Sequence, residues 1–251
     1  MKARGRGVWG KGFAIGTLFC LIFSASIFTQ QVPPIKNDPA ELAEIESKID
    51  RKQIGGLKVA LLNRRTADSS VVVRLELRFG NEKALMNRDV AGDFAGQLLM
   101  RGGTTKRSRE QIEQDLERLN TKLDISGDVF SAWASIKTSR NHLPAVLKLV
   151  GEILREPAYP KDEFDKLQSE VLKIVGDFRT SSQGIAAREL GMKLNTEPRG
   201  HPNYSGSIEE SLARIGAVTL EQTKEFHKTL YGASNGEMTV IGDFDEPEII
   251  R

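Results

Sequence analysis

The chain has 251 residues, of which 39% are hydrophobic and 28% are charged, proportions that are ordinary for a globular protein with a sizeable core. Its formal net charge of +2 is nearly balanced, so no global field directs it towards nucleic acid. The one cysteine, Cys20, lies close to the N-terminus, which excludes a disulfide or a thiolate metal site from the rest of the chain.

Residues 1–28 predict an export signal or a membrane anchor. A basic start precedes a mostly apolar run at 13–28, which is long for a signal-peptide core and slightly short for a spanning helix. The small residues at 24–26 are of the kind that cleavage sites use, and we favour the export signal. Either reading places the body in the periplasm or on the outer face of a membrane. A lipid anchor at Cys20 is rejected, because the bulky Phe19 precedes it.

Residues 29–54 predict a linker followed by a short helix. Asp38 and Pro39 suit the N-cap and the first helical position. The apolar residues Leu42, Ile45 and Ile49 follow at helical spacing, and the glycine pair at 55–56 is expected to end the helix.

Two strands are expected next, over residues 57–62 and 71–79. In the second, apolar residues at every odd position from Val71 to Phe79 alternate with Val72 and three charged residues. This period of two predicts a half-buried strand in an antiparallel sheet that is covered on one side.

The middle of the chain predicts two helices and two further strands. A helix is expected over Val90–Met100, and Ser108 is expected to cap another, with Gln111 in the capping-box position. The inner face of this second helix consists of Ile112, Leu116 and Leu119. Strands are then expected over 123–128 and 130–138.

The C-terminal half predicts mostly helices. Asn141 is expected to cap a strongly amphipathic helix that Glu156-Pro157 ends, and Asp162 is expected to cap the next one. Their apolar faces are Leu143, Val146, Leu147, Val150, Ile153 and Leu154 in the first, and Phe164, Leu167, Val171, Leu172 and Val175 in the second.

Further helices are expected at about 183–194, over 207–215 and from the capping box of Thr219 and Gln222 to about 231, before a last strand at 236–241. This order predicts an α+β fold, a mainly antiparallel sheet with helices packed on one face.

Several segments, taken in order over about residues 55–248, resemble the family of pitrilysin, insulin-degrading enzyme (insulinase) and mitochondrial processing peptidase. They are Gly56–Val59, Leu77–Gly80, Arg101–Thr104, Asn141–Leu147, Ile153–Pro157, His201–Tyr204, Ser207–Ser211, Tyr231–Asn235 and Val240–Asp245. No segment is specific alone, and their order and spacing carry the resemblance. The resemblance implies that residues 55–251 form a single domain of this metallopeptidase type, without the domain that usually follows it.

The same resemblance implies a zinc helix at 88–104, where the family carries His-x-x-Glu-His. The five motif positions here hold Asp93, Phe94, Ala95, Gly96 and Gln97, so both histidines and the glutamate base are absent. The position of the family's distal glutamate ligand falls on Ile174, and Glu170, one turn earlier, is expected to be a solvated helix residue.

A weak metal site at Asp93 and Gln97 is the alternative, because residues four apart share one helix face. Glutamine is a poor zinc ligand and Gly96 offers no base, so we expect no metal, cofactor or catalytic residue in this chain. None of His142, His201 and His227 has a further ligand at metal-binding spacing. His201 begins a loop for which two readings stay open, contact with a substrate or partner and loop structure alone, which already explains Gly200 and Pro202. His227 is expected to be a partly buried structural residue.

Members of this family build a clamshell in which one half carries zinc and the other closes over the peptide. The resemblance therefore implies a non-catalytic domain or subunit of a zinc-dependent peptidase, which binds extended peptide and pairs with a zinc-bearing half. Peptide is expected to add to a free sheet edge through backbone hydrogen bonds. The alternatives are an exported peptide-binding or scaffold protein with no role in proteolysis, and an active hydrolase with an unrecognised site.

Overall fold

The computed structural model describes residues 39–250, so the predicted export segment at 1–28 and most of the predicted linker lie outside the described residues. Within residues 39–250, no helix is both long enough and apolar enough to cross a membrane.

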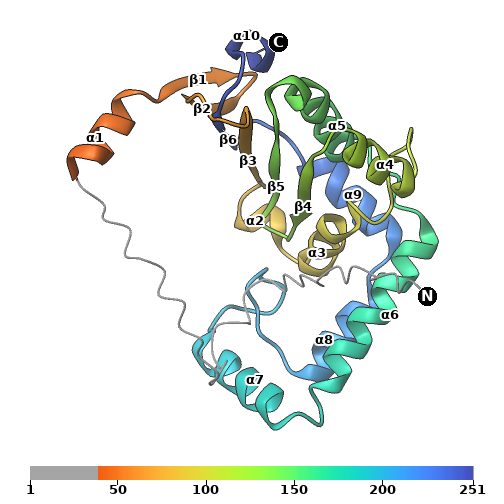
Figure 1. Cartoon of the computed structure of the whole chain (residues 1–251). Coiled ribbons are helices and arrows are strands. Elements are labelled where there is room, and N and C mark those ends of the chain that lie inside the picture. The colour runs from red at the N-terminus through yellow and green to blue at the C-terminus, as the bar shows by residue number, and fades with distance from the viewer. Residues whose placement is uncertain (1–38, 251) are drawn as a thin grey trace, which may run out of the picture. The chain divides into compact units, whose positions relative to one another are not determined.

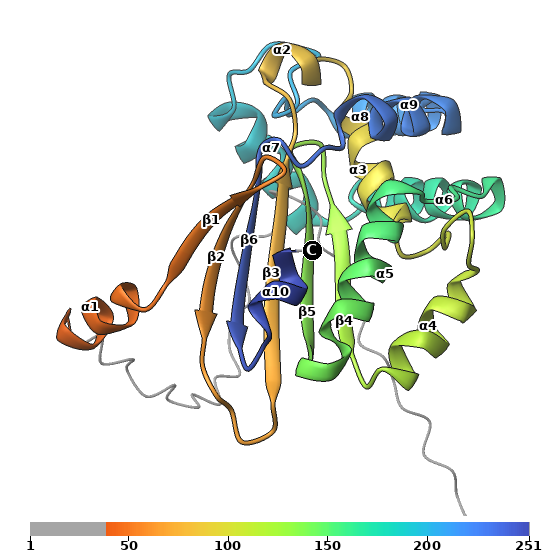
Figure 2. The same cartoon turned by 90° about the horizontal axis from the view of Figure 1, so that it is seen from above.

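The described residues form a six-stranded sheet that helices cover on one face (Figures 1 and 2). The strands lie in the order β1-β2-β6-β3-β5-β4. The pairing of β2 with β6 is parallel and the other pairings are antiparallel, which agrees with the mainly antiparallel sheet predicted for an α+β fold. The bounds are β1 Asp50–Ile54, β2 Leu57–Asn63, β3 Ser70–Arg78, β4 Lys122–Gly127, β5 Ser131–Ser139 and β6 Gly236–Gly242.

Strand β3 confirms the alternation seen in the sequence. Val71 and Val73 are fully buried beneath the helices, whereas Val72 and Arg74 are exposed on the open face. Because β3 lies between β6 and β5, this strand is the centre of the sheet and its buried side chains form the middle of the core.

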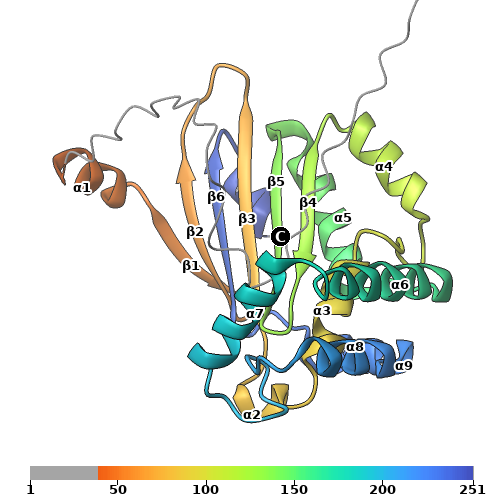
Figure 3. The ribbon, with the colours of Figure 1, turned by 90° about the horizontal axis from the view of Figure 1, so that it is seen from below.

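The helices follow the predicted order with few differences. Their bounds are α1 Pro39–Ser47, α2 Glu82–Leu85, α3 Asp89–Leu98, α4 Arg109–Arg118, α5 Leu143–Arg155, α6 Lys161–Asp177, α7 Ser182–Leu194, α8 Ile208–Ala217, α9 Leu220–Leu230 and α10 Glu246–Ile250. The predicted capping boxes at Ser108 and Thr219 are both present, and Ser207 forms another with Glu210. Figure 3 shows α6 and α8 packed side by side.

The predicted end of the first helix is wrong. Helix α1 ends at Ser47, and the residues up to Ile54 form the edge strand β1, which pairs with β2. Gly55 and Gly56 do not end a helix; their positive φ angles of 54° and 92° form the turn between β1 and β2. The helical spacing of apolar residues stops at Ile49, before β1 begins, and backbone pairing with β2 makes the residues after it a strand.

Two predicted caps are also wrong. Asn141 lies within a 3-10 turn over Arg140–His142, and α5 begins after it without a side-chain cap. Helix α6 follows Pro160, so Asp162 lies inside its first turn, where its charge still complements the helix dipole.

The apolar stripe of α5 is confirmed, except that Leu149 is buried where Leu147 is only half-buried. On α6 only Phe164 and Leu167 are fully buried, so the second half of its predicted inner face is half-exposed.

Candidate functional site

Helix α3, which carries the degenerate motif, lies against the end of strand β4 and the turn into β5 (Figure 2). The helix has small residues on this side, since Gly92, Ala95 and Gly96 are all buried. Such residues let two backbones approach closely, at the cost of the lower helix propensity of glycine.

Gly96 occupies the position of the glutamate base in the motif. A β-carbon added there would lie 2.2 Å from the carbonyl oxygen of Gly127, and one added at Gly92 would lie 2.7 Å from the α-carbon of Val129. Both distances are far below ordinary van der Waals contact. The backbone of the β4–β5 turn therefore fills the space that a side chain at position 96 would need.

Asp93, at the first motif position, holds the same turn. Its carboxylate accepts a hydrogen bond from the backbone N–H of Val129 at 3.1 Å. The pKa of Asp93 is raised to about 7, chiefly by burial and to a smaller extent by the nearby carboxylates of Asp128 and Asp89. The group is thus part neutral and part charged near neutral pH.

The remaining motif positions add no metal chemistry. Gln97 is half-buried on α3, and Ile174 is half-buried near the end of α6. The aromatic contact between the two helices joins Phe94 to Phe164 at 5.5 Å, near the start of α6, whereas Ile174 lies near its end. As predicted, Glu170 is exposed, and it forms an ion pair with Arg101 at 3.0 Å.

This donor set does not fit zinc, because Asp93 alone is a good ligand type and Gly96 supplies no base. Within residues 39–250, no three histidine, cysteine or acidic side chains gather as a metal site would require.

A buried aromatic cluster behind α3 was not predicted. The hydroxyl of Tyr159 donates to the carbonyl of Ala95 at 3.2 Å, which ties α3 to the residues between α5 and α6. Tyr231 stacks on Phe79 at 4.3 Å, and its buried hydroxyl has no hydrogen-bond partner within the described part of the chain. The local sequence around Tyr159 and Tyr231 does not predict their contacts with Ala95 and Phe79, because the partners come from distant segments.

Two histidines are structural in this fold. His227 is half-buried, as predicted; its Nε2 donates to the carbonyl of Leu154 at 2.9 Å, and burial lowers the pKa of the ring. His201 is buried rather than exposed in its loop. Its Nδ1 accepts the backbone N–H of Asn203 at 3.1 Å, so its ring organises the loop.

The outer edge of β4 is a second feature of the site. Among residues 39–250, strand β4 pairs only with β5, and the N–H of Asp128 donates to the carbonyl of Ser131 at 2.8 Å. Because hydrogen-bonded and non-bonded pairs alternate in an antiparallel ladder, Leu123, Ile125 and Gly127 direct their N–H and C=O groups away from β5.

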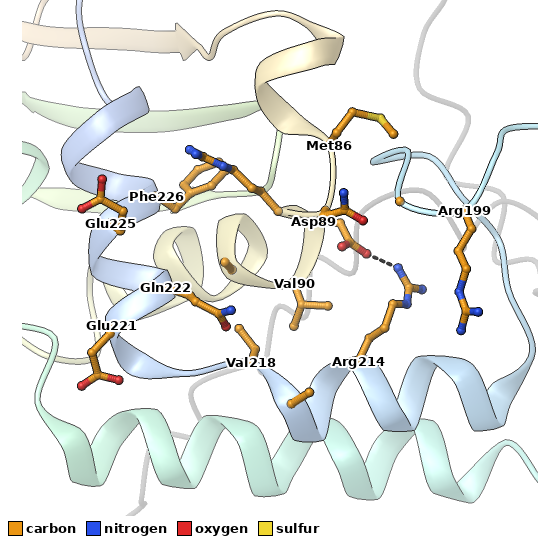
Figure 4. A pocket seen from close by; sticks show the side chains of 15 residues that line it. Met86, Asp89, Val90, Arg199, Arg214, Val218, Glu221, Gln222, Glu225 and Phe226 are labelled. Atoms are coloured by element: carbon orange, nitrogen blue, oxygen red, sulfur yellow. Dashed lines mark hydrogen bonds and ion pairs between the residues drawn. The ribbon is translucent and has the colours of Figure 1, made fainter.

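A cavity of about 760 Å³ lies at the other end of α3, between α8 and α9 (Figure 4). Val90, Val218 and Phe226 are among its apolar residues, and Arg214 forms an ion pair with Asp89 at its rim. Its charged residues come from three separate segments, so the sequence contains no local signal for it.

No family model matches this sequence, and no curated protein matches it. Solved structures do match the fold. The inactive domain of an M16 peptidase from Pseudomonas fluorescens aligns with a TM-score of 0.67 and 21% identity, over 80% of this chain and 48% of that one. A protease from Helicobacter pylori aligns with a TM-score of 0.65 and 19% identity, over the same shares of the two chains.

The periplasmic protease PqqL from Escherichia coli aligns with a TM-score of 0.61 and 17% identity, over 81% of this chain and 23% of that one. The matched region thus spans about half of two of these structures and a quarter of the third. The chain therefore has the fold of an M16 peptidase domain, as the pitrilysin/insulinase resemblance predicts, and one of the solved structures with this fold is an inactive domain.

Proposed function

We propose that this chain is the non-catalytic part of a zinc peptidase of the M16 type, which binds extended peptide and pairs with a zinc-bearing half. The observation that supports it best is the motif helix itself. Helix α3 is buried in a fold shared with M16 peptidases, yet its motif positions carry Asp93, Gly96 and Gln97. Chemistry would then belong to the partner half, and this chain would contribute binding surface.

The β4 edge supports the peptide-binding part of the proposal. An extended peptide can add to an unpaired edge through main-chain hydrogen bonds, largely without regard to its sequence. The edge groups of Leu123 and Ile125 face away from β5, and this strand lies beside the motif helix. The other edge strand, β1, is less suited, because it lies at the opposite edge of the sheet from β4, the strand that contacts the motif helix.

Export is a further part of the proposal. It rests on the sequence of residues 1–28, and the likeness to a periplasmic protease fits a location outside the cytoplasm.

The test uses the full chain alone and mixed with a zinc-bearing M16 peptidase from the same cell. Zinc bound per chain and the rate of cleavage of a fluorogenic peptide are measured. We expect no stoichiometric zinc and no cleavage from the chain alone, and faster cleavage in the mixture than from the partner alone. Stoichiometric zinc with cleavage by the chain alone would contradict the proposal.

A variant of the edge sharpens this test. Leu123→Pro removes an outward N–H and leaves the ladder to β5 intact, because proline is tolerated at such edge positions. We expect it to lose the stimulation, whereas Leu123→Ala, which loses similar packing but keeps the N–H, should retain most of it. Peptide binding without any stimulation would favour the alternative, a binding or scaffold protein with no role in proteolysis.

A further inference from the structure

The free edge of β4 is not open along its whole length. The carbonyl oxygen of Gly127 points away from β5, the direction from which an added strand would approach. Helix α3 already occupies that approach, because a β-carbon on Gly96 would lie 2.2 Å from this oxygen and 2.5 Å from the α-carbon of Gly127. At this end, therefore, a helix backbone lies where a peptide backbone would otherwise lie.

The contact is built from both sides. Gly96 and Gly127 are each buried, and Gly127 itself has no room for a side chain, since its β-carbon would lie 2.8 Å from the carbonyl oxygen of Ser131. Asp93 anchors Val129, two residues after Gly127, by accepting a hydrogen bond from its backbone N–H. Helix α3 and the β4–β5 turn are thus joined by a glycine contact and a hydrogen bond one helical turn apart.

We propose that Gly96 closes the β4 edge at Gly127, so that a peptide added to this edge pairs with Leu123 and Ile125 only. This inference rests on the proposed function, because it concerns how that peptide is bound. It makes Gly96 a positioning residue that sets where the bound strand ends. The edge then selects short extended segments by length and end position.

The consequence for substrates is specific. Only two residues of β4 offer their N–H and C=O to the peptide, and an added strand must stop or turn where it meets α3. Peptides with a short extended stretch bind as well as long ones, and lengthening the stretch past Ile125 adds no further ladder hydrogen bonds.

The experiment measures amide exchange residue by residue, by NMR, in the full chain. The probe is a synthetic peptide of alternating threonine and valine with a lysine at each end. At saturation, exchange of the Leu123 and Ile125 amides should slow by at least about tenfold, because these amides become hydrogen-bonded. The Gly127 amide should exchange slowly without peptide and remain unchanged.

The outcomes separate this inference from the proposed function. If the peptide also protects Gly127 and shifts the Gly96 resonance, the edge is open to its end, and the closure is wrong while strand addition stands. If the peptide changes no β4 amide, strand addition at this edge is wrong, and the inference fails with it. Fast exchange at Gly127 in the free chain, equal to that at Leu123, would overturn the closure by itself.

A pair of peptides gives a second readout that needs no variant. Lengthening the alternating stretch from four to eight residues should leave the dissociation constant within about threefold, since the extra residues gain no hydrogen bonds at a closed edge. A gain of about tenfold or more with length would contradict the closure.

Discussion

Helices α3 and α7 differ sharply in how much of their apolar surface the fold buries. In α3 six of the ten residues are buried, including both glycines of the motif side. In α7 none of the 13 residues is buried, although it carries four exposed large apolar side chains, Ile185, Leu190, Met192 and Leu194. Hydrophobic content alone therefore does not decide which helix joins the core; the gathering of apolar residues on one side of the helix does.

The difference also concerns what each helix contributes to stability. Helix α3 has low intrinsic helix propensity because of its glycines, and its contacts with β4, α6 and α9 compensate for this. Helix α7 is apolar on opposite sides and gains little from burial within this chain. The following substitutions measure this contrast.

The largest effect should come from truncating a leucine on each helix. Leu98 on α3 is fully buried, whereas Leu194 on α7 is 74% exposed. Leu98→Ala should lower the free energy of unfolding by about 2–5 kcal/mol, and Leu194→Ala should change it by less than about 0.5 kcal/mol. Urea unfolding of both variants gives the comparison, and equal losses would mean that α7 is packed within the chain.

The glycine contact should give the next largest effect. Gly96→Ala forces a methyl group into the carbonyl of Gly127, so we expect a loss of about 2–4 kcal/mol in urea unfolding. Gly151→Ala, in the middle of α5 with nothing within 4 Å of the new β-carbon, is the matched control. It should be neutral or stabilising by up to about 1 kcal/mol, because alanine favours helix. If Gly96→Ala and Gly151→Ala changed the free energy of unfolding in the same direction, the contact would be refuted.

Asp93 allows a test by pH. Its pKa is raised from 3.8 to about 7 in the folded chain, so ionisation opposes folding. This penalty is absent below pH 4, grows as the pH rises from 4 to 7, and is constant above that. Asp93→Asn keeps an acceptor for the N–H of Val129 and removes the charge.

The variant should therefore exceed the original chain in stability by about 1–3 kcal/mol at pH 8, a range reduced because Asp93 as a residue is only half-buried, with the difference vanishing near pH 4. Urea unfolding at three pH values measures it. A difference that does not vary with pH would show that Asp93 is solvated in the folded chain.

The smallest effect should come from Tyr231. Its buried hydroxyl has no partner among residues 39–250, so Tyr231→Phe should keep the stacking on Phe79 and change stability by less than about 1 kcal/mol, in the stabilising direction. A loss above about 2 kcal/mol in thermal or urea unfolding would mean that the hydroxyl is hydrogen-bonded in solution.

Much of the fold follows from local patterns in the sequence. The alternation in β3 and the stripe of α5 both report which side of an element faces the core, and they are repeated within single segments. The capping boxes at Ser108 and Thr219 are equally local, because the cap and its partner lie three residues apart. Strand β1 could not be predicted, since its five residues contain one apolar side chain, Ile54, and they become a strand only by pairing with β2.

Less of the candidate site could be predicted. The loss of both histidines and the glutamate base is visible in the residues at 93, 96 and 97. The hydrogen bond from Val129 to Asp93, the raised pKa of that carboxyl and the cavity beside Arg214 are not visible, because each depends on side chains that distant segments bring together.

By itself, the sequence determined the α+β class, most of the helices and strands, and the absence of both histidines and the glutamate base from the motif helix. The tertiary structure alone decided that β6 lies between β2 and β3, that β4 is an edge strand, and that the carbonyl of Gly127 fills the space beside Gly96. The reason is physical. Helical and strand periodicity depends on residues close together in the sequence, whereas strand order and backbone contacts depend on which distant segments meet when the core forms.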